Sequence, residues 1–267
     1  MKNDFLIYRT NHEVLSRITD FFFYIDSPIE RLLSKQEDII PYPRATFGYF
    51  FNHPFLVTNQ HTNESVNLIL TKVSHNGVTV QPTSKRVKIV GVHLQPYILG
   101  YLTNQSAIRL PHIIQAKDLL GDNIASFTQK MESCTHVEEK FRAMEAFILK
   151  NLLQKDLTLI TKIVQLIEQQ SGDVKVDEIA HRLEVSSRTI RNHFYHYVGC
   201  SPKTYIELVK LKKAVYQLNF SEHSLTNISY DSNYFDQSHF IKSLKKFTGK
   251  SPKEIQKESG SFRLLQF

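Results

Sequence analysis

The sequence predicts an α+β chain of two domains: a small N-terminal β-barrel or sandwich with some helices, and an all-α C-terminal domain. Three observations predict this class. Short aromatic and β-branched segments alternate with turn formers through the first half. After Gln95-Pro96 the apolar spacing changes from two residues to about 3.6. In the C-terminal half, a segment of about fifty residues is repeated.

The composition is that of an ordinary folded protein. Hydrophobic residues make up 41% and charged residues 22% of the 267 positions, which suits two domains. No apolar run approaches the roughly 20 residues of a membrane span, and the first residues do not read as a secretory signal. Cys134 and Cys200 are far apart and have no CxxC partner, which disfavours a zinc site and a disulfide framework. We therefore expect a cytoplasmic protein with no membrane association.

The formal net charge of +7 is uneven along the chain. Residues 157–267 hold 16 Lys and Arg against 11 Asp and Glu, a balance of +5, whereas residues 1–156 hold 17 against 15, a balance of +2. A basic C-terminal part suits a polyanionic partner. A solvated basic surface would have the same charge balance, so charge alone does not identify a partner.

In the first half, five short segments and one long one have the composition of strands. The short ones are Phe5–Tyr8, Phe21–Ile25, Ala45–Phe51, Val66–Thr71 and Val78–Val80. The long one is Arg86–Leu94, whose side chains alternate: Lys88, Val90, Val92 and Leu94 lie on one face, and Val87, Ile89 and Gly91 on the other. Short strands with frequent turns predict a small sandwich or barrel.

The following segments have helical spacing. We expect a helix over Asp118–Met131, with Asp122 as a candidate N-cap, and a stronger helix over His136–Leu153. The apolar pattern resumes from Leu157 and continues until Ser171-Gly172-Asp173 interrupts it. The domain border is expected near Gln154–Asp156, as a helical junction without a Gly- or Pro-rich tether.

The repeat is the most informative feature of the sequence. Val198–Lys203 recurs as Thr248–Lys253, Ile190 and Phe194 recur as Phe240 and Leu244, and Ile179-Ala180 recurs as Ile228-Ser229, one residue out of step. In each copy a helix with a small residue is followed by a tight turn and a second helix, and a small residue lets two helices cross closely. A Gly-x-Ser-Pro segment then ends the second helix and starts the next one. The pattern favours two tandem helix-turn-helix units.

From about Leu157 to Lys257 the chain resembles the AraC/XylS family of transcription regulators. The matching motifs are Ile179-Ala180-x-x-Leu183, Ser186-x-Arg188-Thr189-Ile190-Arg191-x-x-Phe194, Gly199-x-Ser201-Pro202, and Asp236-Gln237-Ser238-His239-Phe240-x-x-x-Leu244-Lys245-Lys246-Phe247-Thr248-Gly249-x-Ser251-Pro252. The resemblance implies two helix-turn-helix units joined by a helix over about Pro202–Leu218. Their recognition helices would enter successive major grooves of double-stranded DNA, about 34 Å apart.

Four positions depart from the family's usual pattern. Ser229 stands where Ala is usual, Asn233-Tyr234 where Gly-Phe is usual, and Phe235 where Ser is frequent. Asn tolerates positive φ better than other residues with a side chain, so we expect the second turn to survive. The resemblance leaves open how much the second unit reads bases.

The candidate DNA-binding residues follow from which side of each recognition helix is apolar. In the first helix, starting at Ser186, they are Arg188, Arg191, Asn192 and Tyr195; in the second they are Gln237, His239, Lys242 and, toward backbone phosphate, Lys246. Asp236 is also expected to face the groove. Arg suits guanine O6 and N7, and Asn or Gln suits adenine N6 and N7.

The N-terminal half is similar to the small β-rich sensor domain of some AraC-type regulators, through Gly91–Tyr97, Leu119–Gly121 and the helix Phe141–Leu153. This implies a cupin-like effector or dimerisation domain over residues 1–116, a helical linker over 117–155 and the DNA-binding domain over 156–267. Two alternatives stay open. The aromatic clusters at residues 21–24 and 47–51 either line a pocket or form core, and the helix Val137–Leu153 either pairs with a second copy or covers the β domain.

The regulator hypothesis has two competitors: a helical adaptor that binds protein, and a cupin-type metal enzyme fused to helices. His53, His61, His75, His93 and His112 are scattered and form no His-x-His pair, and no Gly-x-Ser-x-Gly or His-Glu-x-x-His motif occurs. We therefore expect no enzyme activity, no catalytic or metal-binding residue and no cofactor. The expected partners are double-stranded DNA, a small-molecule effector, RNA polymerase and a second copy of the chain.

Overall fold

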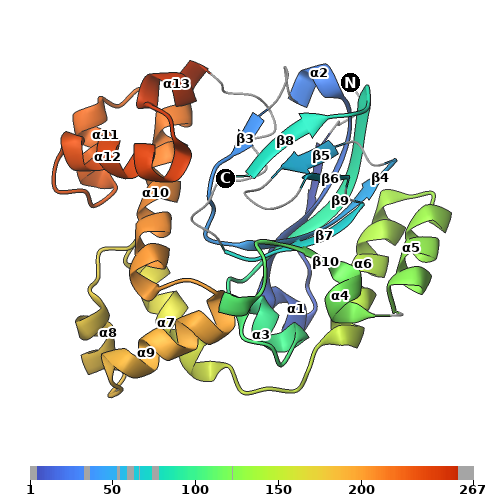
Figure 1. The fold of residues 1–267 in the computed structure, drawn as a ribbon, viewed down its shortest axis with the longest axis horizontal. Coiled ribbons are helices and arrows are strands. Elements are labelled where there is room, and N and C mark those ends of the chain that lie inside the picture. The colour runs from blue at the N-terminus through green and yellow to red at the C-terminus, as the bar shows by residue number, and fades with distance from the viewer. Residues whose placement is uncertain are drawn as a thin grey trace.

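A computed structural model describes residues 5–32, 37–52, 55–58, 63–65, 67–73, 78–121 and 123–257. The N-terminal domain contains two antiparallel sheets (Figure 1). The six-stranded sheet has the order β1-β2-β9-β4-β7-β10 and the four-stranded sheet the order β3-β8-β5-β6. Their bounds are β1 Phe5–Tyr8, β2 Thr19–Pro28, β3 Glu37–Ile39, β4 Ala45–Phe51, β5 Phe55–Thr58, β6 Asn63–Ser65, β7 Leu68–Thr71, β8 Val78–Pro82, β9 Arg86–Leu94 and β10 Ile113–Gln115. The expected β-rich domain is confirmed.

Strand β9 lies in the middle of the larger sheet, between β2 and β4. Val90, Val92 and Leu94 enter one hydrophobic cluster and Val87 and Ile89 another, so the alternation expected along this strand is confirmed. Four short strands, β3, β5, β6 and β10, were not expected from the sequence. Three of them, β3, β6 and β10, have only three residues, which is too short for an alternating pattern to be recognised.

The aromatic clusters at residues 21–24 and 47–51 are mostly core. Phe22, Phe23, Phe47, Tyr49 and Phe51 are all at most 5% exposed. The core is tight enough to require glycine on the opposing strand, since a Cβ on Gly91 would lie 2.4 Å from the Phe23 ring. Packing therefore accounts for these clusters better than a pocket does.

Within its described residues, the N-terminal domain also carries six α-helices and one single turn of 3₁₀ helix. They are α1 Glu13–Ile18, α2 Ile29–Leu32, α3 Ile98–Leu102, η1 Ala107–Arg109, α4 Ala116–Leu120, α5 Asn123–Ser133 and α6 Val137–Asn151. The single helix expected over Asp118–Met131 is wrong: Gly121 takes φ +54° and separates α4 from α5. The candidate N-cap Asp122 lies outside the described residues.

Helices α5 and α6 cover the six-stranded sheet (Figure 1). The Phe127 ring of α5 stacks on the Phe147 ring of α6 with 4.2 Å between centroids, and both contact Phe47 of β4. Met131 and Met144 are completely buried in the same cluster. The segment expected to be a helical linker therefore contributes to the N-terminal core.

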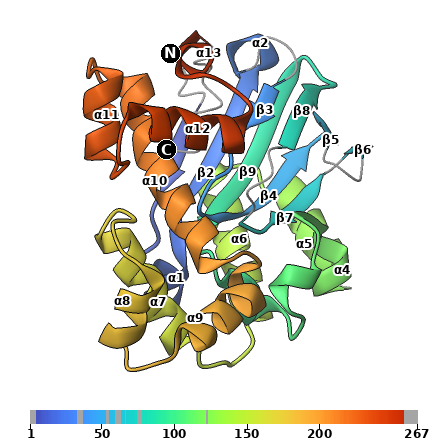
Figure 2. The same cartoon turned by 60° about the vertical axis from the view of Figure 1, so that its left-hand side comes forward.

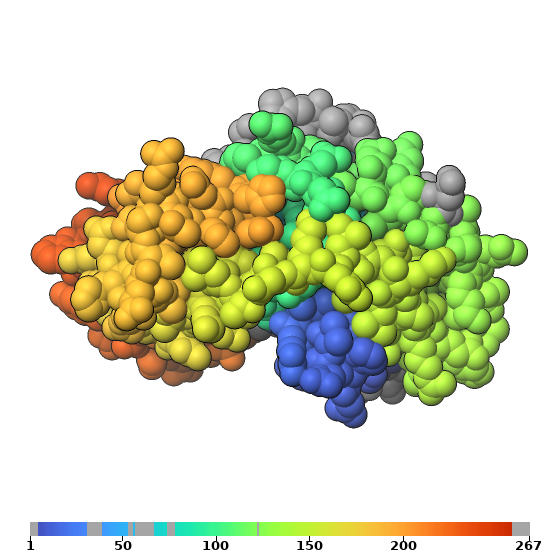
Figure 3. Space-filling view, turned by 90° about the horizontal axis from the view of Figure 1, so that it is seen from below, coloured from blue at the N-terminus to red at the C-terminus, as the bar shows by residue number. Residues whose placement is uncertain are grey.

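Residues 152–157 join α6 to the C-terminal helices and are not helical, which corrects the expected helical junction. Their hydrogen bonds go back to the end of α3: the Leu153 N–H donates to the Tyr101 carbonyl at 2.7 Å, and the Lys155 Nζ donates to the Thr103 carbonyl at 2.6 Å. The Leu153 bond gives its backbone N–H a partner outside the segment, in place of the i to i−4 bond that a helix would supply. Figure 3 shows this yellow-green segment crossing between the two domains.

The C-terminal domain is entirely helical, as expected. Its helices are α7 Thr158–Gln169, α8 Val176–Arg182, α9 Ser187–His193, α10 Pro202–Phe220, α11 Leu225–Asp231, α12 Gln237–Thr248 and α13 Pro252–Lys257, and α9 continues as a π-helical segment, η2, over Phe194–Val198. The long α10 connects the pair α8–α9 to the pair α11–α12 (Figure 2). No helix of the described residues is long and apolar enough to cross a membrane.

The two domains share hydrophobic packing. Ile40, Val73 and Tyr97 of the N-terminal domain belong to the same buried cluster as the C-terminal helices. At the other end of the interface, residues 247–250 of the second helix pair line a pocket of about 250 Å³ with Ile39, Ile40 and Thr79. The N-terminal domain therefore contacts both halves of the helical domain.

Candidate nucleic-acid interface

The first helix pair is a helix-turn-helix with its second helix capped by Ser186. The Ser186 Oγ accepts a hydrogen bond from the Thr189 N–H at 3.0 Å, which fixes the start of α9. Glu184 in the turn has φ +54°, and the Val185 N–H donates to the Ala180 carbonyl at 3.0 Å. Ala180 is buried where the helices cross, as the small residue requires.

The apolar face of α9 is directed inward, since Ile190 and Phe194 are completely buried. The expected reading residues Arg188, Arg191 and Asn192 are exposed, and the described residues offer their side chains no hydrogen bond or ion pair. Tyr195 is 41% exposed, and its carbonyl accepts a long bond from the Ser106 Oγ. The first three side chains thus project from a capped helix without an internal partner.

The second helix pair repeats this geometry with one residue more. The Tyr234 N–H donates to the Ser229 carbonyl at 2.9 Å, as Val185 does to Ala180 in the first unit. Asn233 has φ +61°, like Glu184, so the expected survival of this turn is confirmed. Phe235 is the additional residue, and it explains why the two copies are out of step.

Asp236 caps α12, a role that the sequence analysis did not assign to it. Its Oδ1 accepts from the His239 N–H at 2.7 Å, because the first N–H groups of a helix lack internal partners. Phe240 and Leu244 are completely buried, so the inward face of α12 is as expected.

The candidate residues of α12 differ in how free they are. His239 and Lys242 are exposed, whereas Gln237 is half-buried and its Oε1 accepts from the Thr226 hydroxyl at 3.1 Å. The Lys246 Nζ forms an ion pair with Glu207 of α10 at 2.8 Å. A phosphate contact by Lys246 would therefore compete with a carboxylate of its own chain.

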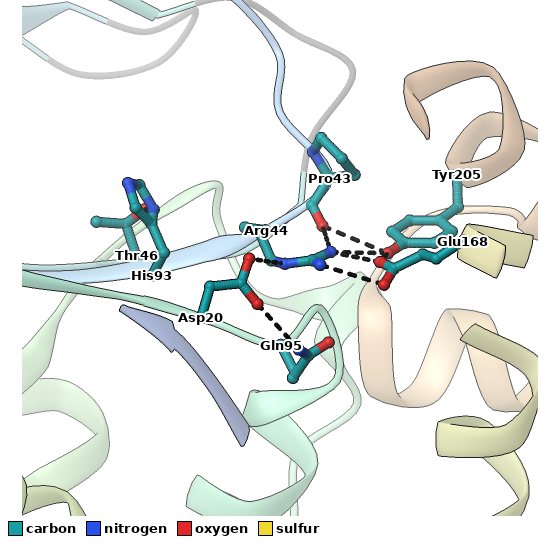
Figure 4. A network of polar contacts seen from close by, with 8 residues as sticks. All are labelled: Asp20, Pro43, Arg44, Thr46, His93, Gln95, Glu168 and Tyr205. Carbon is teal, nitrogen blue, oxygen red and sulfur yellow. Dashed lines mark hydrogen bonds and ion pairs between the residues drawn. The ribbon is translucent and has the colours of Figure 1, made fainter. Parts of the chain in front are cut away.

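Arg44 joins the two domains through a buried polar network (Figure 4). Its Nε donates to Asp20 at 2.6 Å within the N-terminal domain, and its guanidinium pairs with both oxygens of Glu168 on α7. The hydroxyl of Tyr205, at the start of α10, donates to the same Glu168 carboxylate. Gln95 completes the set by donating to Asp20 at 3.1 Å. We call Asp20, Arg44, Glu168 and Tyr205 the interdomain clamp.

Burial alone would lower the pKa of Arg44, but Tyr205, Asp20 and Glu168 outweigh it and raise that pKa well above its ordinary value. Arg44 is therefore a permanent cation in a site whose Arg side chain is only 9% exposed. Nearby, burial and then the Arg44 charge lower the pKa of Lys212 on α10. Sequence patterns could not reveal this network, because 124 positions separate Arg44 from Glu168.

Among the described residues, no group of three or more His, Cys, Asp or Glu side chains is placed to hold a metal ion.

Comparison with known proteins agrees with this geometry. A family model described as "Helix-turn-helix domain" matches residues 179–258, and a second, described as "HTH domain", matches residues 160–194. Curated relatives are named "HTH-type transcriptional activator RhaS". The C-terminal domain is an AraC/XylS-family double helix-turn-helix domain. The RhaS protein of Mannheimia succiniciproducens is 27% identical over 84 residues, which cover 32% of this chain and 31% of that protein.

Longer matches exist at similar or lower identity. RhaS of Salmonella arizonae is 21% identical over 161 residues, covering 60% of this chain and 58% of that protein. The chain thus matches less than two thirds of the length of these curated relatives. Among solved structures, ToxT from Vibrio cholerae aligns with a TM-score of 0.55 at 14% identity, covering 88% of this chain and 98% of that one. That likeness shows the two-domain fold.

Proposed function

We propose that this chain is a DNA-binding transcription regulator whose helices α9 and α12 enter the major groove of double-stranded DNA. The observation that supports it best is the outer face of α9, where Arg188, Arg191 and Asn192 project from a capped helix without protein partners. Planar Arg and Asn groups at the N-terminal part of a recognition helix suit base edges. The names of the curated relatives support the same function over a protein-binding adaptor.

The test is selection of binding sites from random-sequence duplex DNA by the whole chain, followed by titration of the selected duplex. Arg191→Ala should weaken binding to that duplex by about 1–3 kcal/mol, as loss of a base-edge contact does, and should relax specificity at one position. Arg142→Ala is the matched control, since Arg142 is an exposed arginine on α6. Equal binding by Arg191→Ala and the control would remove Arg191 from the reading face.

The resemblance also predicts a small-molecule effector, and a pocket at the domain boundary suits an acidic one. It has a volume of about 260 Å³ and is lined by Arg44, Glu168, Lys212, Lys213 and Tyr216, among others. Two solved ToxT structures are described as bound to an unsaturated fatty acid and to a substituted butenoic acid. A pocket below the usual range of about 300–1,000 Å³ favours a short carboxylic acid here.

Thermal unfolding with and without a series of short carboxylic acids tests this effector site. A bound acid should raise the midpoint in a concentration-dependent way, because ligands that bind only the folded state stabilise it. Lys212→Met should abolish the shift; a shift of equal size in that variant would exclude the site. Homodimer formation and contact with RNA polymerase remain predictions, and sedimentation of the whole chain checks the first.

A further inference from the structure

Phe235 is the most exposed large apolar side chain of the described residues, with 85% of its surface accessible. A single exposed Phe needs no explanation by itself. This one is the additional residue of the second turn: Tyr234 corresponds to Val185 and Asp236 to Ser186, so Phe235 has no counterpart in the first unit. It stands directly before the cap of α12.

The ordinary role of an apolar residue before an N-cap is a hydrophobic staple, in which it packs on the fourth residue of the helix. That residue is Phe240, which is completely buried. The Phe240 ring packs against Tyr234 instead, with 5.3 Å between ring centroids. Phe235 therefore contributes no staple, and local packing does not account for its ring.

The backbone holds Phe235 in place despite its exposure. On one side the Tyr234 N–H donates to the Ser229 carbonyl, and on the other Asp236 caps the helix. The Phe235 N–H itself points toward the His239 Nδ1, at 3.4 Å. The ring is thus presented from a fixed position at the N-terminal end of α12.

The opposite end of α12 faces the N-terminal domain. Phe247, Thr248 and Gly249 line the pocket shared with Ile39 and Ile40. Phe235 and Gln237 lie at the other, N-terminal end of α12, and neither lines this pocket. In helix-turn-helix units it is this end of the recognition helix that contacts base edges.

We propose that the Phe235 ring contacts the C5-methyl group of a thymine in the half-site that α12 reads; this rests on the DNA-binding function proposed above. The thymine methyl is the apolar group that base pairs present in the major groove, and Phe is among the side chains that contact it. Gln237, two residues later, has its amide oxygen oriented by Thr226 and suits adenine. Together the two side chains select A·T pairs.

The experiment removes the methyl group without changing base pairing. A duplex selected by the whole chain from a random-sequence library is resynthesised with each thymine replaced in turn by deoxyuridine. The wild type should lose about three- to fivefold in affinity at one position of the α12 half-site. Phe235→Ala should bind the thymine duplex as weakly as the wild type binds that uracil duplex, and should no longer distinguish the two.

Two variants sharpen this comparison. Phe235→Leu should keep part of the methyl preference, because an apolar side chain remains. Phe220→Ala removes an exposed phenyl ring at the end of α10 and should keep the full preference of the wild type.

Each contrary outcome has one meaning. If the wild type selects no duplex, the DNA-binding function and this inference both fall. If the wild type does select a duplex, but every uracil substitution lowers the affinity of the wild type and of Phe235→Ala equally, the inference alone is overturned. Unchanged DNA binding by Phe235→Ala, with loss of transcription activation by RNA polymerase, assigns the ring to a protein contact and also overturns it.

Discussion

At the scale of single residues, His193 couples the stability of the C-terminal end of α9 to pH. Its imidazole is half-buried against Tyr197, with 5.5 Å between ring centroids, and its Nδ1 has no hydrogen-bond partner among the described residues. Burial and then the nearby His196 lower the pKa of His193 below its ordinary value. The folded chain therefore holds this ring neutral at a pH where an unfolded chain has begun to protonate it.

The sign of the pH dependence follows from this difference. Between the folded pKa and the unfolded value of about 6.5, the unfolded state binds more protons, so the free energy of unfolding rises with pH. This stability is lost as pH falls through that window. His193→Gln should flatten the contribution, giving a smaller difference in urea midpoint between pH 5.5 and pH 7.5 than the wild type has. His12→Gln, at an exposed position, should leave the difference in urea midpoint as it is in the wild type. An equal difference in all three proteins would contradict the role given to His193.

At the scale of elements, the sequence predicted where helices begin and end better than which elements they pack against. Ser186 and the left-handed Gly199 and Gly249 carry local signals, because a cap or a positive φ is decided by a few adjacent residues. Phe235 also carried a signal, since the repeat slips by one residue there. The capping role of Asp236 was missed, because spacing alone does not show whether a carboxylate accepts the first N–H groups of a helix.

The turn between α7 and α8 depends on a glycine, Gly172. Gly172 has φ +77°, and a Cβ there would lie 2.9 Å from the Ile206 carbonyl oxygen of α10. Gly172→Ala should therefore cost both left-handed strain and a backbone clash, about 2–4 kcal/mol in all. Gly249→Ala has φ +71° but open space, and should cost only about 1–2 kcal/mol. Urea denaturation of both variants measures the difference; equal losses would show that the clash is relieved by movement of α10.

At the scale of the whole molecule, the sequence predicted the two kinds of domain but not how they meet. Periodicity identifies a strand or helix from neighbouring residues, whereas the shared core of Ile40, Val73 and Tyr97 with the C-terminal helices depends on tertiary packing. The same applies to α6, whose apolar stripe fits either a sheet or a second copy of the chain. For the candidate DNA-binding residues the outward face was predictable, while the ion pair of Lys246 with Glu207 was not.

The interdomain clamp holds the helical domain against the N-terminal domain. Removing Arg44 leaves Asp20 and Glu168 without their cation in a largely buried site, and breaking a buried ion pair in this way costs about 3–5 kcal/mol. Because both carboxylates keep some contact with water, Arg44→Ala should lie near the lower end of that range. Arg86→Ala, which breaks the exposed pair with Asp26, should cost less than about 1 kcal/mol. Since Arg44 joins the domains, its variant should also be cleaved faster by protease within residues 152–157, whereas Arg86→Ala should not. A loss shared equally by both variants, with unchanged cleavage, would mean that apolar packing alone holds the helical domain against the sheets.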